Sequence, residues 1–111
     1  MKVPNCQNAE VPESKIVDYL LSPGHMEGGP KARFFFGWGF TIEEWSVLAS
    51  ALIKQVNEND YVNAVGGRHG TKYIVVASMK SPKGETTAVK TIWMIAEGTQ
   101  HPRLITAYPA S

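Results

Sequence analysis

The chain has 111 residues, of which 43% are hydrophobic and 19% charged, as expected for one globular domain with a single core. Its formal net charge is only +1, which disfavours a broad basic surface for long nucleic acids; any nucleic-acid site must depend on a local cluster of cations. The single cysteine, Cys6, excludes an internal disulfide.

The composition also limits cofactors and location. The three histidines are far apart and lack metal-ligand spacing, so we expect no metal or other cofactor. There is neither a recognisable secretory leader nor an apolar run of about 18 residues, the length that a membrane helix needs. We therefore expect a cytoplasmic protein without membrane contact.

The first half of the chain is predicted to be helical. Residues 1–12 lack periodicity and are predicted to form an irregular arm. Pro12 suits the first position of a helix that runs to about Leu21 and places Ile16, Tyr19 and Leu20 on one apolar stripe.

Two more helices are expected before residue 60. Pro30 can open a short helix over residues 31–36, which Gly37 and Gly39 end. The segment from Thr41 to Glu44 has the pattern of a capping box and precedes an apolar helical face that extends to about Asn57. The predicted helical region therefore covers residues 13–57.

After residue 60 the apolar period changes from about 3.6 to 2. Residues 61–65, 73–78, 88–96 and 103–108 are predicted strands, and each connection is too short for a crossover helix. The sequence thus predicts a single α+β domain over residues 1–111, with N-terminal helices packed on one face of a three- to four-stranded antiparallel sheet over 61–108. We expect one buried cluster made of Phe35, Trp45, Leu48, Leu52, Trp93 and Ile95.

Five phrases of the sequence resemble, in order, an uncharacterised family of small bacterial domains of unknown function. They are SKIVDYLLSPGH, GGPKARFFFGWGF, GTKY, TIWMI and PRLITAYP, and the resemblance covers about residues 5–109. The layout is also similar to toxin modules of the barnase–EndoU–colicin–RelE group of ribonucleases. That resemblance implies helices on a four-stranded antiparallel sheet and RNA cleavage without a metal.

Such cleavage needs a base for the 2′-hydroxyl, an acid for the 5′-oxygen and a cation for the phosphorane. His25 and Lys31 flank the loop before Pro30, where helix amides, Lys31 and Arg33 could bind a phosphate. The alternative is a tight connection that ends in a solvated lysine.

A glycine-flanked turn supplies the second group of candidates. Arg68, His69 and Lys72 would offer a phosphate two cations and an imidazole. The alternative is a surface hairpin whose glycines adopt positive φ.

The last strand supplies the third group. Thr106 and Tyr108 lie two residues apart and share a face of a regular strand, and Leu104 would share that face while Arg103 would point away. In the ribonuclease group a hydroxyl-bearing residue on the last strand often lies in the site. The alternative is that Tyr108 packs its ring on the core and exposes its hydroxyl.

Two functions therefore compete. The first is a metal-independent endoribonuclease toxin, with His25, Lys31, His69, Thr106 and Tyr108 as catalytic candidates and Arg33, Arg68 and Lys72 as substrate-binding candidates. RNA of tRNA type and a cognate antitoxin or immunity protein are its expected partners. The second is a non-catalytic binding or immunity-type module, favoured by the near-neutral charge and by an apolar arm that could cover a partner.

Overall fold

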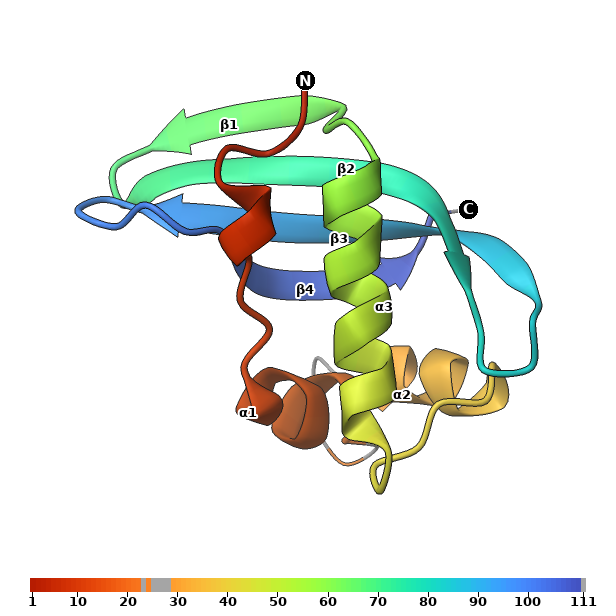
Figure 1. Ribbon diagram of the computed structural model, residues 1–111. Coiled ribbons are helices and arrows are strands. Elements are labelled where there is room, and N and C mark those ends of the chain that lie inside the picture. The colour runs from red at the N-terminus through yellow and green to blue at the C-terminus, as the bar shows by residue number, and fades with distance from the viewer. Residues whose placement is uncertain (23, 25–28, 111) are drawn as a thin grey trace.

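A four-stranded sheet and a helical layer make up the protein (Figure 1). The computed structural model describes residues 1–22, 24 and 29–110. The elements in chain order are a 3-10 turn η1 (Cys6–Asn8), α1 (Glu13–Lys15), a π-helical turn η2 (Ile16–Leu20), α2 (Gly29–Gly37), α3 (Trp45–Glu58), β1 (Asn63–Gly67), β2 (Gly70–Lys80), β3 (Thr86–Ala96) and β4 (Arg103–Pro109).

The strands form a meander in the order β1-β2-β3-β4, and all three neighbouring pairs are antiparallel. The predicted α+β fold is therefore confirmed. Figure 1 shows α3 crossing one face of the sheet, whereas α1 and α2 lie beyond β4. We call the sheet face away from α3 the open face.

The arm over residues 1–12 belongs to the domain itself. Glu10 forms an isolated parallel bridge with Arg103, outside the named strands, and its carbonyl accepts from the Leu104 amide at 3.0 Å. Val3 and Cys6 are buried in the core. Val3 and Cys6 are thus used within the chain and cannot cover a partner, which corrects the expectation from the sequence for these two residues, whereas Met1 is 85% exposed.

Strand alternation separates the core from the open face. Val75, Val89 and Trp93 are fully buried beneath the helical layer, together with Leu48 and Leu52 of α3, and Phe35 of α2 joins the same cluster. Two of the six predicted core residues differ, since Trp45 and Ile95 are only half-buried. Trp45 begins α3 and packs at the rim of the cluster, and Ile95 lies at the end of β3.

A chain of buried hydrogen bonds joins α3 to the centre of the sheet. The Gln55 amide donates to the carbonyls of Ala77 and Val89 at 3.0 and 2.8 Å. Its side-chain oxygen accepts from Thr91, whose hydroxyl accepts from the Trp93 indole N–H. Each buried polar group of this chain has a partner, so burial of Gln55 carries no uncompensated desolvation cost.

The start of α3 matches the predicted capping box in part. The Glu44 amide donates to the Thr41 hydroxyl at 3.2 Å, as expected, although the regular helix begins one residue later at Trp45. The helix then extends to Glu58, one residue beyond the predicted end.

A β-bulge changes the orientation of side chains along β4. Ile92 pairs with Thr106 and Trp93 with Leu104, so Ile105 is the extra residue on β4. Because a bulge interrupts alternation, Leu104 joins the core face, whereas Arg103 shares the open face with Thr106 and Tyr108. The regular strand predicted from the sequence would place Leu104 and Arg103 on the opposite faces, and that prediction is therefore wrong.

Candidate functional site

A hydrogen-bonded chain links three elements where the helices meet β4. The Lys31 ammonium donates to the Tyr19 hydroxyl at 2.5 Å, and the Tyr19 Oη and Thr106 Oγ1 atoms lie 3.1 Å apart. Lys31 comes from the first turn of α2, Tyr19 from η2 and Thr106 from β4. All three side chains are at least partly buried, which restricts their movement.

Three lysines gather around two tyrosine rings at the same place. The ammonium groups of Lys15 and Lys31 each lie 4.9 Å from the centre of the Tyr19 ring. Those of Lys31 and Lys90 each lie 5.7 Å from the centre of the Tyr108 ring. All four contacts are within the about 6 Å of a cation–π interaction. We call these five residues and Thr106 the lysine–tyrosine cluster.

Local structure explains how the cluster forms. Lys15 and Tyr19 are four residues apart on the continuous turn of α1 and η2, so their side chains lie on one side of it. Lys90 and Tyr108 are directly paired across β3 and β4 on the open face. Lys31 stands between these two pairs and contacts both rings.

The ion pairs of the described residues do not involve the lysines of the cluster. Among the residues that the structure describes, the one ion pair joins the N-terminus to Asp60 at 3.4 Å, and no Lys–carboxylate pair within 4.0 Å occurs. Three ammonium groups that share two tyrosines create a local excess of positive charge. Such a site attracts an anion with several oxygen atoms, such as a phosphate or phosphodiester.

The structure brings together three of the eight predicted site residues. Lys31, Thr106 and Tyr108 are all in the cluster. His25 lies outside the described residues, and Arg33 is exposed on α2, two residues after Lys31.

The glycine-flanked turn lies elsewhere on the sheet. Arg68 and His69 are exposed in the β1–β2 turn, where the His69 carbonyl accepts from the Glu97 amide at 2.9 Å. Gly70, which follows the turn, pairs with Ala96 of β3. Ala96 is six residues from Lys90, which is roughly 20 Å at about 3.3 Å per residue. One phosphate therefore cannot contact both the β1–β2 turn and the lysine–tyrosine cluster.

Lys15, Tyr19 and Lys90 of the cluster are not among the site residues predicted from the sequence. Tyr19 was assigned to an apolar helical stripe, and its ring is indeed half-buried. The spacing of Lys15 and Tyr19 by four residues was a usable signal. Lys90 could not be found in this way, because its position beside Tyr108 depends on the register of β3 and β4.

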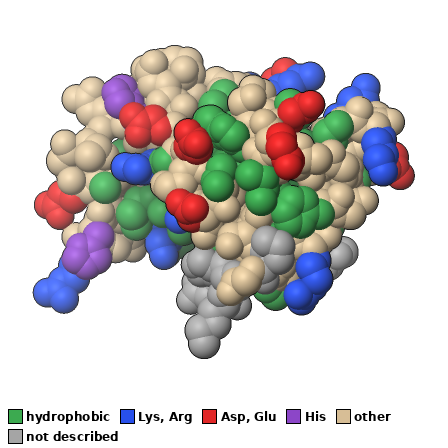
Figure 2. Space-filling view, turned by 90° about the horizontal axis from the view of Figure 1, so that it is seen from below, with side chains coloured by type: hydrophobic (Ala, Val, Ile, Leu, Met, Phe, Trp, Pro, Cys, Tyr) green, Lys and Arg blue, Asp and Glu red, His purple; other side chains and the backbone are tan. Residues whose placement is uncertain are grey.

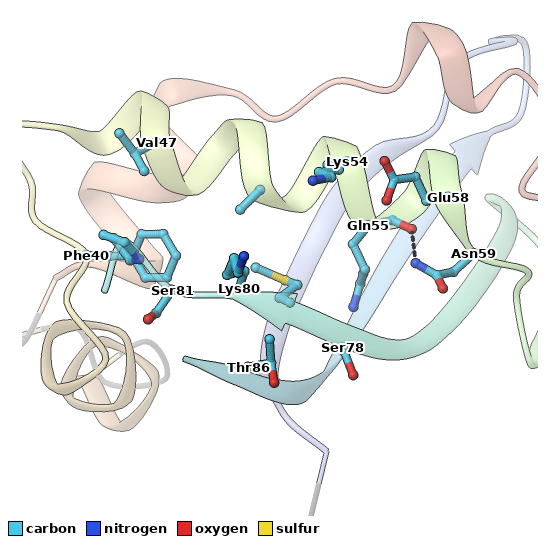
Figure 3. Close-up of a pocket in the computed structure, with 13 residues that line it drawn as sticks. Phe40, Val47, Lys54, Gln55, Glu58, Asn59, Ser78, Lys80, Ser81 and Thr86 are labelled. Carbon is cyan, nitrogen blue, oxygen red and sulfur yellow. Dashed lines mark hydrogen bonds between the residues drawn. The ribbon is translucent and has the colours of Figure 1, made fainter. Parts of the chain in front are cut away.

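A groove beside α3 has a different chemistry (Figure 3). It has a volume of about 310 Å³ and lies between α3 and the β2–β3 end, with Phe40, Val47 and Met79 among its apolar lining residues. Lys54, Lys80 and Glu58 carry its charges. The Asn59 amide donates to the Gln55 backbone carbonyl there at 2.9 Å, so that pair is already engaged.

The surface seen from below carries charges of both signs (Figure 2). Hydrophobic side chains gather near its middle with Asp and Glu among them, and much of the Lys and Arg lies toward the margins. Within the described part of the chain, no group of three His, Cys, Asp or Glu residues could hold a metal ion. The described helices also include none that is long and apolar enough to span a bilayer.

Comparison with solved structures supports the fold. The chain is similar to a chain of the contact-dependent growth inhibition toxin–immunity protein complex from Klebsiella pneumoniae 342, with a TM-score of 0.71 and 16% sequence identity. The similarity covers 96% of this chain and 97% of that one. At this identity it establishes a common fold.

Comparison with protein families is more direct. No curated protein matches the chain significantly. A family model, described as a domain of unknown function, matches residues 2–111, which is nearly the whole chain. The chain therefore belongs to the family of the domain of unknown function DUF6883.

Proposed function

We propose that this domain is a metal-independent endoribonuclease of the type used as a bacterial toxin, with the lysine–tyrosine cluster at its centre. The observation that carries the proposal is the convergence of Lys15, Lys31 and Lys90 on Tyr19 and Tyr108, with no carboxylate paired to these lysines in the described chain. A scissile phosphodiester is an anion that such a cluster can bind.

The chemistry follows from the groups at hand. A base removes the proton of the 2′-hydroxyl, whose oxygen attacks phosphorus; the bond to the 5′-oxygen breaks, and an acid protonates that oxygen. Lys31 and Lys90 stabilise the charge that develops on the phosphorane, and the hydroxyls of Thr106 and Tyr108 orient its oxygens. His25, six residues before Lys31, is the proposed proton-transfer group.

The remaining predicted residues take supporting roles in this proposal. Arg33, exposed in the middle of α2, binds a neighbouring phosphate. Arg68 and His69 contact RNA away from the scissile bond, because roughly 20 Å separates their turn from the cluster. Lys72 contacts it from β2, four residues or roughly 13 Å from the strand partner of Lys90. The toxin context is supported by the common fold with a chain of a toxin–immunity protein complex.

Purified protein incubated with total tRNA in excess EDTA tests the proposal. We expect the wild type to cut the RNA and Lys31→Met to lose at least about a hundredfold in rate, the lower range for removing one charge-stabilising donor. Lys83→Met is the matched control, since it removes the same charge from an exposed turn. Intact RNA with the wild type, or cleavage only after a divalent metal is added, would contradict the proposal.

The second candidate is a non-catalytic immunity-type or binding module. The net charge of +1 and the mixed charges of the face in Figure 2 favour it. The presence of an immunity protein in the structurally similar complex also favours it. Expression of the domain from an inducible promoter separates the two candidates. Growth arrest with RNA fragments indicates the enzyme, whereas normal growth and intact RNA indicate the binding module.

A further inference from the structure

The charges of the chain are divided between its two layers. The four strands together contain Lys72, Lys80, Lys90 and Arg103 and no Asp or Glu, so the nine acidic residues that the structure describes lie outside the strands. Although the net charge of the chain is only +1, all charged residues of the four strands are therefore basic. The open face of the sheet can present a positive surface although the whole chain is nearly neutral.

The cations of the open face have a defined arrangement. Lys90, a member of the lysine–tyrosine cluster, pairs across the strands with Val76 of β2. By strand alternation Lys72 and Lys80 share the face of Val76, four residues away on either side, or roughly 13 Å at about 3.3 Å per residue. Lys80, at the end of β2, also lines the groove beside α3. Both lysines are exposed. The two lysines differ in the side chains that lie between each of them and Lys90 on the open face.

Between Lys90 and Lys72 the open face is apolar. Ile74 and Ile92 are a cross-strand pair there, and Met94 is the partner of Lys72; all three side chains are half-buried. Toward Lys80 the corresponding pair is Ser78 and Ala88, both small and exposed. Only the first path combines charge at both ends with an apolar surface in the middle.

We infer that the open face binds a single-stranded segment of RNA that runs from the lysine–tyrosine cluster to Lys72. This inference rests on the proposed function and assigns its substrate class. Phosphates contact Lys90 and Lys72, and unpaired bases lie against Ile74 and Ile92. Bases of a duplex are stacked and paired, so they cannot lie flat on such a surface, whereas the bases of a single strand can.

Arg68 extends this path. It occupies the β1–β2 turn, four residues before Lys72, and is exposed. By contrast, Arg103 shares a groove of about 230 Å³ with the carboxylate-bearing Glu10, which lowers the local positive charge. The path therefore leads along β2 toward the turn and not toward the start of β4.

Binding can be measured separately from cleavage. The probe is a fluorescent 2′-O-methyl oligouridylate of about ten nucleotides, within the usual range of single-strand sites, and it lacks the nucleophile for cleavage. Affinity is measured over a range of salt concentrations for the wild type, Lys72→Met and Lys80→Met. The two variants remove equal charge from exposed positions of one strand, so Lys80→Met is the matched control.

We expect Lys72→Met to bind up to about fivefold more weakly at low salt, with a salt slope smaller by about 0.7, the contribution of one phosphate contact on a single strand. Lys80→Met should resemble the wild type. A duplex of the same length should bind more weakly than the single strand. Equal effects of the two variants, or a preference for the duplex, would overturn the inference.

Failure of the path and failure of the proposed function give different results. If the wild type cuts tRNA but Lys72→Met and Lys80→Met bind the oligonucleotide equally, the path is wrong and the enzyme assignment stands. If the oligonucleotide binds as expected but tRNA stays intact, the path stands and the enzyme assignment fails. Absence of any oligonucleotide binding overturns the path and leaves the exposed Val65 and Val76 as a surface for a protein.

Discussion

The hydroxyl oxygens of Tyr19 and Thr106 lie 3.1 Å apart although 87 positions separate the two residues in the sequence. This contact joins η2 to β4, the last strand, and Lys31 donates a hydrogen bond to the same Tyr19 hydroxyl. The site is therefore assembled from both ends of the chain. A change at any of these three residues should affect the others.

Thr106→Val should lower RNA cleavage with a modest loss of stability. Valine keeps the shape of threonine but removes the hydroxyl next to Tyr19, and a typical hydrogen bond contributes about 0.5–1.5 kcal/mol. Thr87→Val, on the opposite face of the sheet, is the control. Cleavage by Thr106→Val at the wild-type rate would show that this hydroxyl has no part in the reaction.

The three histidines can be compared directly. His25→Ala should reduce cleavage by about 10²–10⁴-fold, the usual contribution of a general acid or base. His69→Ala should have a smaller effect, because the β1–β2 turn lies far from the cluster, and His101→Ala should have little effect. Thermal unfolding of each variant is the control for folding. A larger loss for His69→Ala than for His25→Ala would move the reaction centre to the turn.

Trp93→Ala should cost about 3–5 kcal/mol of unfolding free energy, the range for a large buried aromatic side chain. Trp93 is fully buried, and its indole N–H donates to Thr91. Ile95→Ala, on the same strand but only half-buried, should cost less. Urea denaturation measures both, and a loss below about 1 kcal/mol for Trp93→Ala would place Trp93 outside the core.

Gln55→Leu should destabilise the fold although it adds an apolar side chain to a buried site. The carbonyls of Ala77 and Val89 would lose their donor, and the Thr91 hydroxyl would lose its acceptor. Each buried group left unpaired costs about 1–3 kcal/mol. Gln7→Leu, at an exposed position of the arm, is the control. A Gln55→Leu variant as stable as the wild type would mean that water replaces these bonds.

Gly70→Ala should destabilise the β1–β2 hairpin. Gly70 has a φ of 137°, and a Cβ atom there would lie 2.3 Å from the Ile95 carbonyl oxygen. Gly66→Ala is the matched control, because nothing lies within 4 Å of a Cβ at that position. We expect a clear drop in Tm for Gly70→Ala only. Similar Tm values for the two variants would show that β3 moves to accommodate the methyl group.

Much of the fold can be predicted from the sequence because it depends on local patterns. The change of apolar period after residue 60 predicted the antiparallel meander, and the segment from Thr41 to Glu44 predicted the entry of α3. These features follow from the spacing of apolar residues and from local hydrogen bonds. The ends of the strands were predicted less accurately, since β2 begins at Gly70 and not at Tyr73.

The candidate site depended on tertiary structure in a way that local patterns do not encode. Lys31, Thr106 and Tyr108 were found from residue chemistry and a family resemblance, but their contacts require Tyr19 and Lys90, whose positions follow from helix docking and strand register. The bulge at Ile105 also reversed the faces of Leu104 and Arg103. One extra residue changes which side chains face the core, and only pairing with β3 places it.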